Sequence, residues 1–197
     1  MLDRYRHLFG LKIATVTNSD KDICDLVTQV LVNWGFKVFT VENSPLRETA
    51  AFFEHSLPYL LEKADSEDLL YYCHSKGVTY LPESETGKAV NIWTDLLIKK
   101  TLEEPIPFED KRYSAFGTLK IGGSFLPDKL GEQFSYIGTY FWIRISKLIS
   151  RTFDYSVSKF YLESLPGQVM SFEEGYSIPP TITKKDNPYL LSTWSNL

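Results

Sequence analysis

The sequence predicts an α/β fold: a single domain, residues 1–197, with a mostly parallel sheet flanked by helices. The first observation is a β-branched run at residues 11–17, a helical pattern after it and a second run at 37–41, which form a strand–helix–strand unit of about 30 residues. The second is an apolar run at 69–73, as expected of an interior parallel strand. The third is that the sequence contains no internal repeat and no linker between two domains.

Composition excludes several classes of protein. Of 197 residues, 43% are apolar and 23% charged, which is typical of a folded globular chain. The net charge of -4 and a pI of about 5.4 argue against a nucleic-acid binder, which needs a basic face. No apolar stretch approaches the roughly 20 residues that span a bilayer, and the charged residues 1–7 do not resemble a signal peptide. We therefore expect a cytoplasmic protein without a membrane span.

The cysteines and histidines predict no metal framework. Cys24 and Cys73 lie inside apolar periodic segments, so we expect free, buried thiols in a reducing compartment. With two cysteines and three histidines, the sequence lacks the ligand spacing of a Cys/His metal site.

In the first half of the chain, capping and periodicity predict two helices. A polar cluster at 18–20 precedes a helix whose apolar repeat predicts one buried face, made of Ile23, Leu26, Val27, Val30 and Leu31. Gly35 is the expected C-cap of this helix. A second helix opens at Ser44 and Pro45, and Pro58 inside its apolar pattern predicts a kink or a break.

In the second half, one helix and several strands are expected. A helix over 88–103 carries an apolar side, made of Val90, Trp93, Leu96, Leu97 and Thr101. Residues 113–121 predict a strand that the pair of glycines at 122–123 ends, and residues 134–145 predict a long aromatic strand or a pair of strands. From residue 165 onward the pattern is irregular.

The first candidate site is His74-Ser75-Lys76-Gly77, directly after the third strand. Ligands of open α/β sheets bind beyond the carboxyl ends of strands. Gly77 allows close backbone approach, Lys76 is a cation suited to phosphate, and His74 can donate a hydrogen bond or act as a general base. The alternative is a plain strand end with a solvated lysine, a capped histidine and a turn glycine.

The second candidate is Tyr136-Ile137-Gly138-Thr139-Tyr140-Phe141-Trp142. A glycine weakens a strand, so Gly138 marks either a bulge or a place where a ligand nears the backbone. Tyr136 and Thr139 add hydroxyl groups, and Trp142 can stack on the face of a sugar. The alternative is an aromatic core strand with one bulge.

The third candidate is the acidic segment Glu163-Ser164-Leu165-Pro166-Gly167, followed by Glu173 and Glu174. A transfer that inverts an anomeric centre needs a carboxylate base, and any of the three glutamates can supply it. The alternative is a solvated acidic loop.

Taken together, these three segments resemble a family of bacterial glycosyltransferase-like proteins. Members carry a strand ending in His-(Ala/Ser/Thr)-Lys-Gly-Val, here residues 74–78, and a Tyr-Ser-Gly-(Thr/Asn)-Phe-(Phe/Trp)-Trp motif, here 136–142. They also carry Glu-(Ser/Thr)-Trp-Pro-Gly, here 163–167, with an acidic pair after it. The likeness spans nearly the whole chain.

The resemblance implies a GT-A fold, that of nucleotide-diphospho-sugar transferases, and transfer of a sugar from a nucleotide diphosphate to a glycan acceptor. Lys76, Gly77 and Ser75 would then meet the donor phosphates, while His74 would face the sugar or the metal region. Tyr136, Gly138, Thr139, Trp142, Glu173 and Glu174 would line the sugar or acceptor pocket, and Glu163 would be the base. GT-A enzymes commonly use a divalent cation, Mn²⁺ or Mg²⁺, although no metal ligand is assigned here.

Departures from the family pattern leave two other functions open. The His74 segment stands where GT-A enzymes carry Asp-x-Asp after a strand, Ile137 replaces a serine and Leu165 a tryptophan. The extra first strand and helix of the family are represented here by residues 3–9 alone. The alternatives are a non-catalytic carbohydrate- or nucleotide-binding relative of this fold, and a structural or partner-binding protein.

Overall fold

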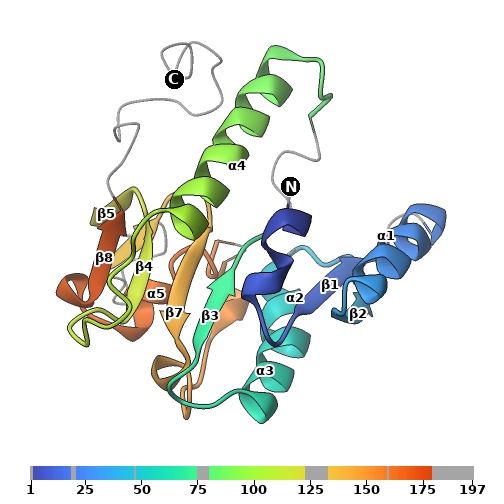
Figure 1. The fold of residues 1–197 in the computed structure, drawn as a ribbon. Coiled ribbons are helices and arrows are strands. Elements are labelled where there is room, and N and C mark those ends of the chain that lie inside the picture. The colour runs from blue at the N-terminus through green and yellow to red at the C-terminus, as the bar shows by residue number, and fades with distance from the viewer. Residues whose placement is uncertain are drawn as a thin grey trace.

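The computed structural model describes residues 2–18, 21–46, 48–74, 80–122, 133–158 and 160–178. Within them the chain forms a mixed α/β fold with three sheets (Figure 1). Strands β1 (Ile13–Thr17) and β2 (Lys37–Val41) make a parallel pair. The central sheet has the order β3-β7-β4-β8, with the bounds Leu69–Tyr72, Phe141–Arg144, Ala115–Thr118 and Gly175–Ile178. Strands β5 (Lys120–Gly122) and β6 (Phe134–Tyr136) make an antiparallel pair.

The α/β class is confirmed, but the prediction of a mostly parallel sheet is wrong. Strand β7 runs antiparallel to both of its neighbours, β3 and β4, and the β4–β8 pairing is the one parallel pairing among the described strands of the central sheet. Strand β3, expected in the interior, is half-buried at the edge of that sheet. The apolar run predicted neither the edge position of β3 nor the direction of its partner, because both depend on residues far away in the sequence.

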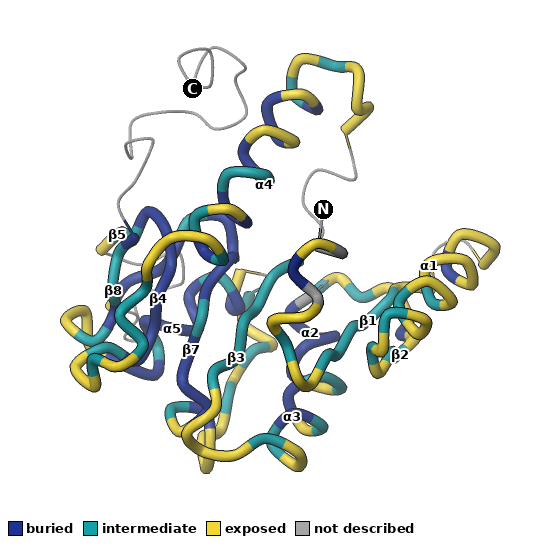
Figure 2. Tube along the Cα trace, viewed as in Figure 1, coloured by how far each residue is buried: buried dark blue, intermediate teal, exposed yellow. Residues whose placement is uncertain are grey.

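The parallel β1–α1–β2 unit forms as predicted, but the helix α1 (Lys21–Asn33) is not buried as predicted. Cys24 is its only buried residue among those described. The expected core face is largely exposed: Ile23, Leu26, Val27 and Val30 are 61%, 62%, 39% and 38% accessible. Leu31 is half-buried. Helical spacing revealed an apolar face correctly, but the unit lies at one side of the molecule, and most of this face is open (Figures 1 and 2).

The irregularity predicted at Pro58 takes the form of a π-helical turn. Helix α2 (Glu48–Ala51) continues through the turn η2 (Phe52–Ser56) into helix α3 (Leu57–Lys63). The Leu57 N–H donates to the carbonyl of Phe52, five residues back. Pro58 has no N–H and cannot donate a hydrogen bond to a carbonyl in the preceding turn. The wider π-helical turn accommodates the carbonyls that precede Pro58.

Helix α4 (Glu85–Glu103) matches the expected helix and its apolar side. Its N-cap is Ser84, whose Oγ accepts the Gly87 N–H at 3.0 Å. Val90, Trp93, Leu97 and Thr101 are buried as predicted. Leu96 is half-buried.

Two expected strands are each divided. Leu119, at a φ of +49°, separates β4 from β5 within the predicted strand 113–121. A turn at 137–140 separates β6 from β7 within 134–145, which is the predicted alternative of two strands. The chain therefore passes at Leu119 from the central sheet to the β5–β6 pair, and no glycine or proline at that position indicates the change in the sequence.

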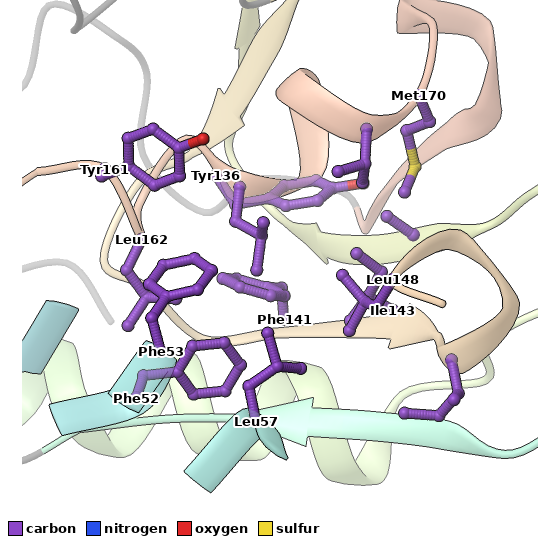
Figure 3. Packing of buried hydrophobic residues seen from close by; sticks show 14 of the residues in the cluster. Phe52, Phe53, Leu57, Tyr136, Phe141, Ile143, Leu148, Tyr161, Leu162 and Met170 are labelled. Carbon is purple, nitrogen blue, oxygen red and sulfur yellow. The ribbon is translucent and has the colours of Figure 1, made fainter. Parts of the chain in front are cut away.

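Two hydrophobic clusters cover the two faces of the central sheet. Side chains alternate between faces along a strand, so Phe141 and Ile143 of β7 point to one cluster while Tyr140 before the strand belongs to the other. Figure 3 shows the first cluster, where Phe52, Phe53 and Leu57 meet Phe141 and the Tyr161–Leu162 segment. The second cluster is formed by Trp93 and Leu97 of α4 with Leu119, Tyr140 and Tyr71.

Short helical turns complete the described chain: η1 (Leu2–Leu8), η4 (Ile145–Lys147), η5 (Tyr155–Val157), α5 (Leu165–Val169) and η6 (Phe172–Glu174). None of the helices among the described residues has the length and apolar content that a bilayer crossing requires. Cys24 and Cys73 are both free thiols.

Candidate functional site

The end of β3 lies against the turn that precedes β7. Tyr72, the last residue of β3, pairs with Phe141, the first residue of β7. Two residues beyond β3, the carbonyl of His74 accepts a hydrogen bond from the Tyr140 hydroxyl at 2.9 Å. Their rings lie 6.4 Å apart. The first and second candidate segments are therefore neighbours, as the predicted site requires.

Tyr140 acts as a fixed donor at this junction. It is almost fully buried in the cluster with Trp93 and Leu97, and burial raises the pKa of its hydroxyl well above the ordinary value. The hydroxyl therefore keeps its proton and continues to donate to His74 across the physiological pH range. Because His74 immediately precedes residues 75–79, this hydrogen bond holds the point from which that segment leaves the sheet.

The turn before β7 is conformationally strained. Gly138 has a φ of +99°, and a Cβ there would lie 2.5 Å from Leu97 Cδ1. Thr139 follows at a φ of +59°, a left-handed conformation that costs a β-branched residue about 1–2 kcal/mol. Gly138 is thus required by a turn that packs on α4. The break expected in this aromatic run is the turn between β6 and β7, and contact of Gly138 with a ligand stays a prediction.

Thr139 is a buried polar residue at the same junction. It is fully buried, and no described residue forms a hydrogen bond with its Oγ1. A hydroxyl buried without a partner costs about 1–3 kcal/mol. Strain and an unsatisfied hydroxyl on one residue are typical of a site whose partner is a ligand or another part of the chain.

Ser75, Lys76 and Gly77, the expected phosphate-binding residues, lie outside the described residues. Their role in phosphate binding remains a prediction. The structure relates them to the site only in that Ser75 follows His74, whose carbonyl is held by Tyr140.

Trp142 is half-buried and packed among aromatic side chains. Its Nε1 donates to the carbonyl of Thr101 at 2.8 Å, and its ring lies 4.9 Å from Tyr71 and within 6 Å of Phe9 and Phe108. Both the polar and the apolar part of the side chain are used in packing β7 against α4 and Phe9. These contacts favour the core alternative that the aromatic composition left open, and stacking of Trp142 on a sugar stays a prediction.

Tyr136 is a core residue on the opposite face of the sheet. It is fully buried, its hydroxyl donates to the carbonyl of Tyr176 at 2.9 Å, and a Cβ at Gly117 would lie 2.6 Å from its ring. Burial raises the pKa of this phenol well above its usual range. The side chain ties β6 to β8 and is not available to a ligand.

Glu163 lies in a half-buried turn between buried neighbours. Leu162 and Ser164 flank it and are almost fully buried, and Leu162 belongs to the cluster that also contains Phe141. Trp142 belongs to the other face of β7, so the sheet separates it from the Glu163 segment. The Glu163 segment and Trp142 thus lie on different faces of the sheet, and the role of Glu163 as the base stays a prediction.

Glu174 is occupied by structural contacts, whereas Glu173 is exposed. Lys147 Nζ donates to Glu174 Oε1 at 2.5 Å, and the Ser171 N–H donates to Oε2 at 3.0 Å as part of a capping box. Burial alone would raise the pKa of this carboxyl, but these hydrogen bonds and the Lys147 charge outweigh it and lower the pKa. Glu174 therefore stabilises η6, which carries the chain into β8.

The lowered pKa of Glu174 predicts a loss of stability in acid. A carboxyl with a lower pKa in the folded state stabilises the fold above its unfolded pKa, near 4.5, and loses this contribution as the pH falls through the folded value. Urea titrations should show wild type more stable than Glu174→Gln at pH 7 by about 0.5–1 kcal/mol, with the difference shrinking as the pH falls below the unfolded pKa.

Glu173→Gln is the matched control for this experiment, because Glu173 is exposed beside Glu174. It should leave the free energy of unfolding at pH 7 within about 0.5 kcal/mol of wild type. A difference between wild type and Glu174→Gln that persists unchanged to pH 3 would contradict the assigned role of the Lys147 pair.

Lys120 is a polar residue whose role sequence reasoning missed. Its Nζ donates to the carbonyls of Phe172 and Gly175 and lies 3.8 Å from the centre of the Phe172 ring. Desolvation lowers the pKa of this ammonium group. The lysine joins β5 to η6 by contacts between residues about fifty positions apart, which no local pattern reveals.

The described residues offer no ligand set for a divalent cation. Among them, no three His, Cys, Asp or Glu side chains come together as metal ligands require. The Asp-x-Asp in this sequence, Asp20-Lys21-Asp22, stands at the start of α1 and not after β3, and Asp20 lies outside the described residues. No step proposed below uses a metal.

Comparison with known proteins identifies no relative. No family model matches the chain, and searches of curated proteins and of solved structures found no match.

Proposed function

We propose that the chain is a glycosyltransferase of GT-A-like fold that binds a nucleotide diphosphate sugar at the end of β3. The observation that carries the proposal is the junction of His74 with the strained turn at Gly138 and Thr139, held by the Tyr140 hydroxyl. Ligands of α/β folds bind at such strand ends, and backbone strain concentrates at binding sites. The helices on both faces of the central sheet are consistent with this fold.

In the proposed reaction, Lys76 and the backbone at Gly77 bind the diphosphate, which is the leaving group. A glutamate removes the proton of the acceptor hydroxyl, the acceptor oxygen bonds to the anomeric carbon, and the bond from that carbon to the phosphate oxygen breaks. Glu163 is the assigned base because the resemblance gives it that role, whereas Glu174 is committed to Lys147 and Glu173 is exposed. His74 is assigned to orient the donor sugar.

Binding of the donor is tested by calorimetry with nucleoside diphosphates and their sugars, with and without Mn²⁺. We expect a nucleotide sugar to bind and Lys76→Ala to weaken binding about 10-fold or more, because a charged contact to phosphate is lost. Lys99→Ala is the matched control, since Lys99 is exposed on α4, and it should bind as wild type does. Absence of binding to every nucleotide sugar would overturn the proposal.

A non-catalytic nucleotide- or carbohydrate-binding relative of the fold is the second candidate. The engagement of Glu174 with Lys147 and of Trp142 with Thr101 favours it, because both remove groups that a transferase site was expected to use. Glu163→Gln separates the two functions. In a transferase it should lower turnover about 100-fold or more while leaving donor binding unchanged. In a binding protein, wild type itself binds the donor without turnover.

A further inference from the structure

Phe9 lies across the rings of two residues of the central sheet. Its ring is stacked on Tyr71 of β3 at 5.6 Å and 20°, and on Trp142 of β7 at 5.8 Å and 26°. Tyr71 and Trp142 pair with each other across the two strands, and all three side chains are half-buried. Stacking on aromatic rings is also how proteins hold the flat face of a nucleoside base. Phe9 therefore covers a surface on which a ring of a ligand can bind.

The segment that carries Phe9 has few buried contacts. η1, the dark-blue turn beside the N label in Figure 1, is a 3-10 helix of seven residues. Runs of this length are uncommon, because 3-10 hydrogen bonds have poor geometry. Arg4, His7 and Leu8 are exposed, and Tyr5 is the one buried residue among those of η1 whose burial is described. Segments of this kind are the first to open locally.

Glu103 latches this segment to the end of α4. The Tyr5 hydroxyl donates to Glu103 Oε1, and Arg4 Nη2 lies 2.7 Å from the same oxygen. The ion pair is exposed, so it adds little to the closure. On the other side of Phe9, Gly10 lies in an open bend, where an added Cβ would meet no atom within 4 Å. The segment thus has a latch at Glu103 and room to pivot at Gly10.

We propose that residues 2–9 form a strap that closes the face of Tyr71 and Trp142, and that the base or sugar ring of a nucleotide sugar replaces Phe9 there. This inference rests on the proposed function and adds an autoinhibitory contact to its site. Tyr71 stands three residues before His74, which is about 10 Å of extended chain. A nucleotide sugar with its phosphates beyond His74 is long enough to place a ring on Trp142.

The strap reduces the affinity for such a donor. A closed molecule offers no place for the ring, so the apparent Kd is the intrinsic Kd divided by the fraction of open molecules. Changes that remove Phe9 or release the latch should therefore strengthen binding, whereas loss of an ordinary packing contact would not.

Hydrogen exchange tests the strap without any ligand. In wild type, the amides of residues 2–9 should exchange at least 10-fold faster than those of residues 90–97 in α4. Tyr5→Phe keeps the ring but removes the hydroxyl that donates to Glu103, so it should speed exchange in the strap and leave α4 unchanged. Exchange in the strap as slow as in α4 would overturn the proposal.

Calorimetry with UDP-glucose and GDP-mannose tests what the strap covers. Phe9→Ala should lower the Kd of the probe about 10-fold, because the competing ring is removed. Leu8→Ala is the matched control: Leu8 is 50% exposed on the same turn, and the change should leave the Kd as in wild type. Tyr5→Phe gives a second measurement if Phe9→Ala lowers Tm, and it should also lower the Kd.

Separate titrations identify the ring that replaces Phe9. A Kd lowered by Phe9→Ala for UDP or GDP assigns the base to this face, and one lowered for methyl glucoside assigns the sugar. Binding of the probes with an equal or higher Kd in Phe9→Ala would overturn the strap and leave the proposed function standing. Absence of binding by every probe to wild type and variant alike would overturn the proposed function, and the ring site with it.

Discussion

Replacing Gly167 by alanine should destabilise the fold by about 4 kcal/mol or more, the largest loss expected of any single methyl group added to this chain. A Cβ at Gly167 would lie 1.8 Å from the carbonyl oxygen of Phe134 and 2.4 Å from its nitrogen. These are backbone atoms of β6 and cannot rotate away as a side chain does. Helix α5 would have to move off the strand, which would also break the hydrogen bond from the Gln133 N–H to the Gly167 carbonyl. Urea unfolding followed by tryptophan fluorescence measures the loss.

Gly10→Ala is the control for that substitution. No atom lies within 4 Å of a Cβ built at Gly10, so the variant should unfold within about 0.5 kcal/mol of wild type. If Gly167→Ala were equally mild, α5 would not contact β6 as closely as described.

Truncation of Phe141 to alanine should cost about 3–5 kcal/mol. Phe141 is fully buried at the centre of the cluster in Figure 3, with its ring 5.6 Å from Tyr72 and 6.4 Å from Tyr136. The cavity left by its ring would be enclosed by η2 on one side and by the Leu162 segment on the other. Thermal and urea unfolding of the variant measure this loss.

Phe141→Leu and Phe160→Ala calibrate the cavity prediction. Leucine fills part of the space, so Phe141→Leu should cost less than the alanine variant. Phe160 is 45% exposed, and its truncation should cost under about 1 kcal/mol. A ranking in which Phe160→Ala is as costly as Phe141→Ala would contradict the packing described for this core.

The sequence predicted the local parts of the fold and missed the non-local ones. The β1–α1–β2 unit and α4 depend on periodicity and caps within a few residues, and both are present. The antiparallel direction of β7 depends on residues far apart, such as Leu69 and Arg144, which no local pattern links. The left-handed backbone conformation of Leu119 could not be predicted either, because leucine has no preference for that conformation.

The candidate site was predicted in part for the same reason. We expected His74 and the turn at Gly138 to lie side by side. His74 follows a strand and Gly138 precedes one, and a glycine marks the break in the pattern near each of them. The roles of Tyr136 and Trp142 could not be predicted, because the sequence does not distinguish an aromatic side chain in a core from one in a sugar pocket. Likewise, the periodicity of α1 identified its apolar face but not what covers it.

The pairing of β4 with β8 has a consequence for synthesis of the protein. Strand β4 lies between β7 and β8, and its partner residues in β8, such as Gly175 opposite Ala115, leave the ribosome much later. Until then one edge of β4 has unpaired backbone groups, and such an edge can recruit a strand from another nascent chain. Closure of the central sheet is thus a late, non-local step, which slows folding. We expect this topology to increase the dependence of expression on chaperones more than it changes the stability of the folded protein.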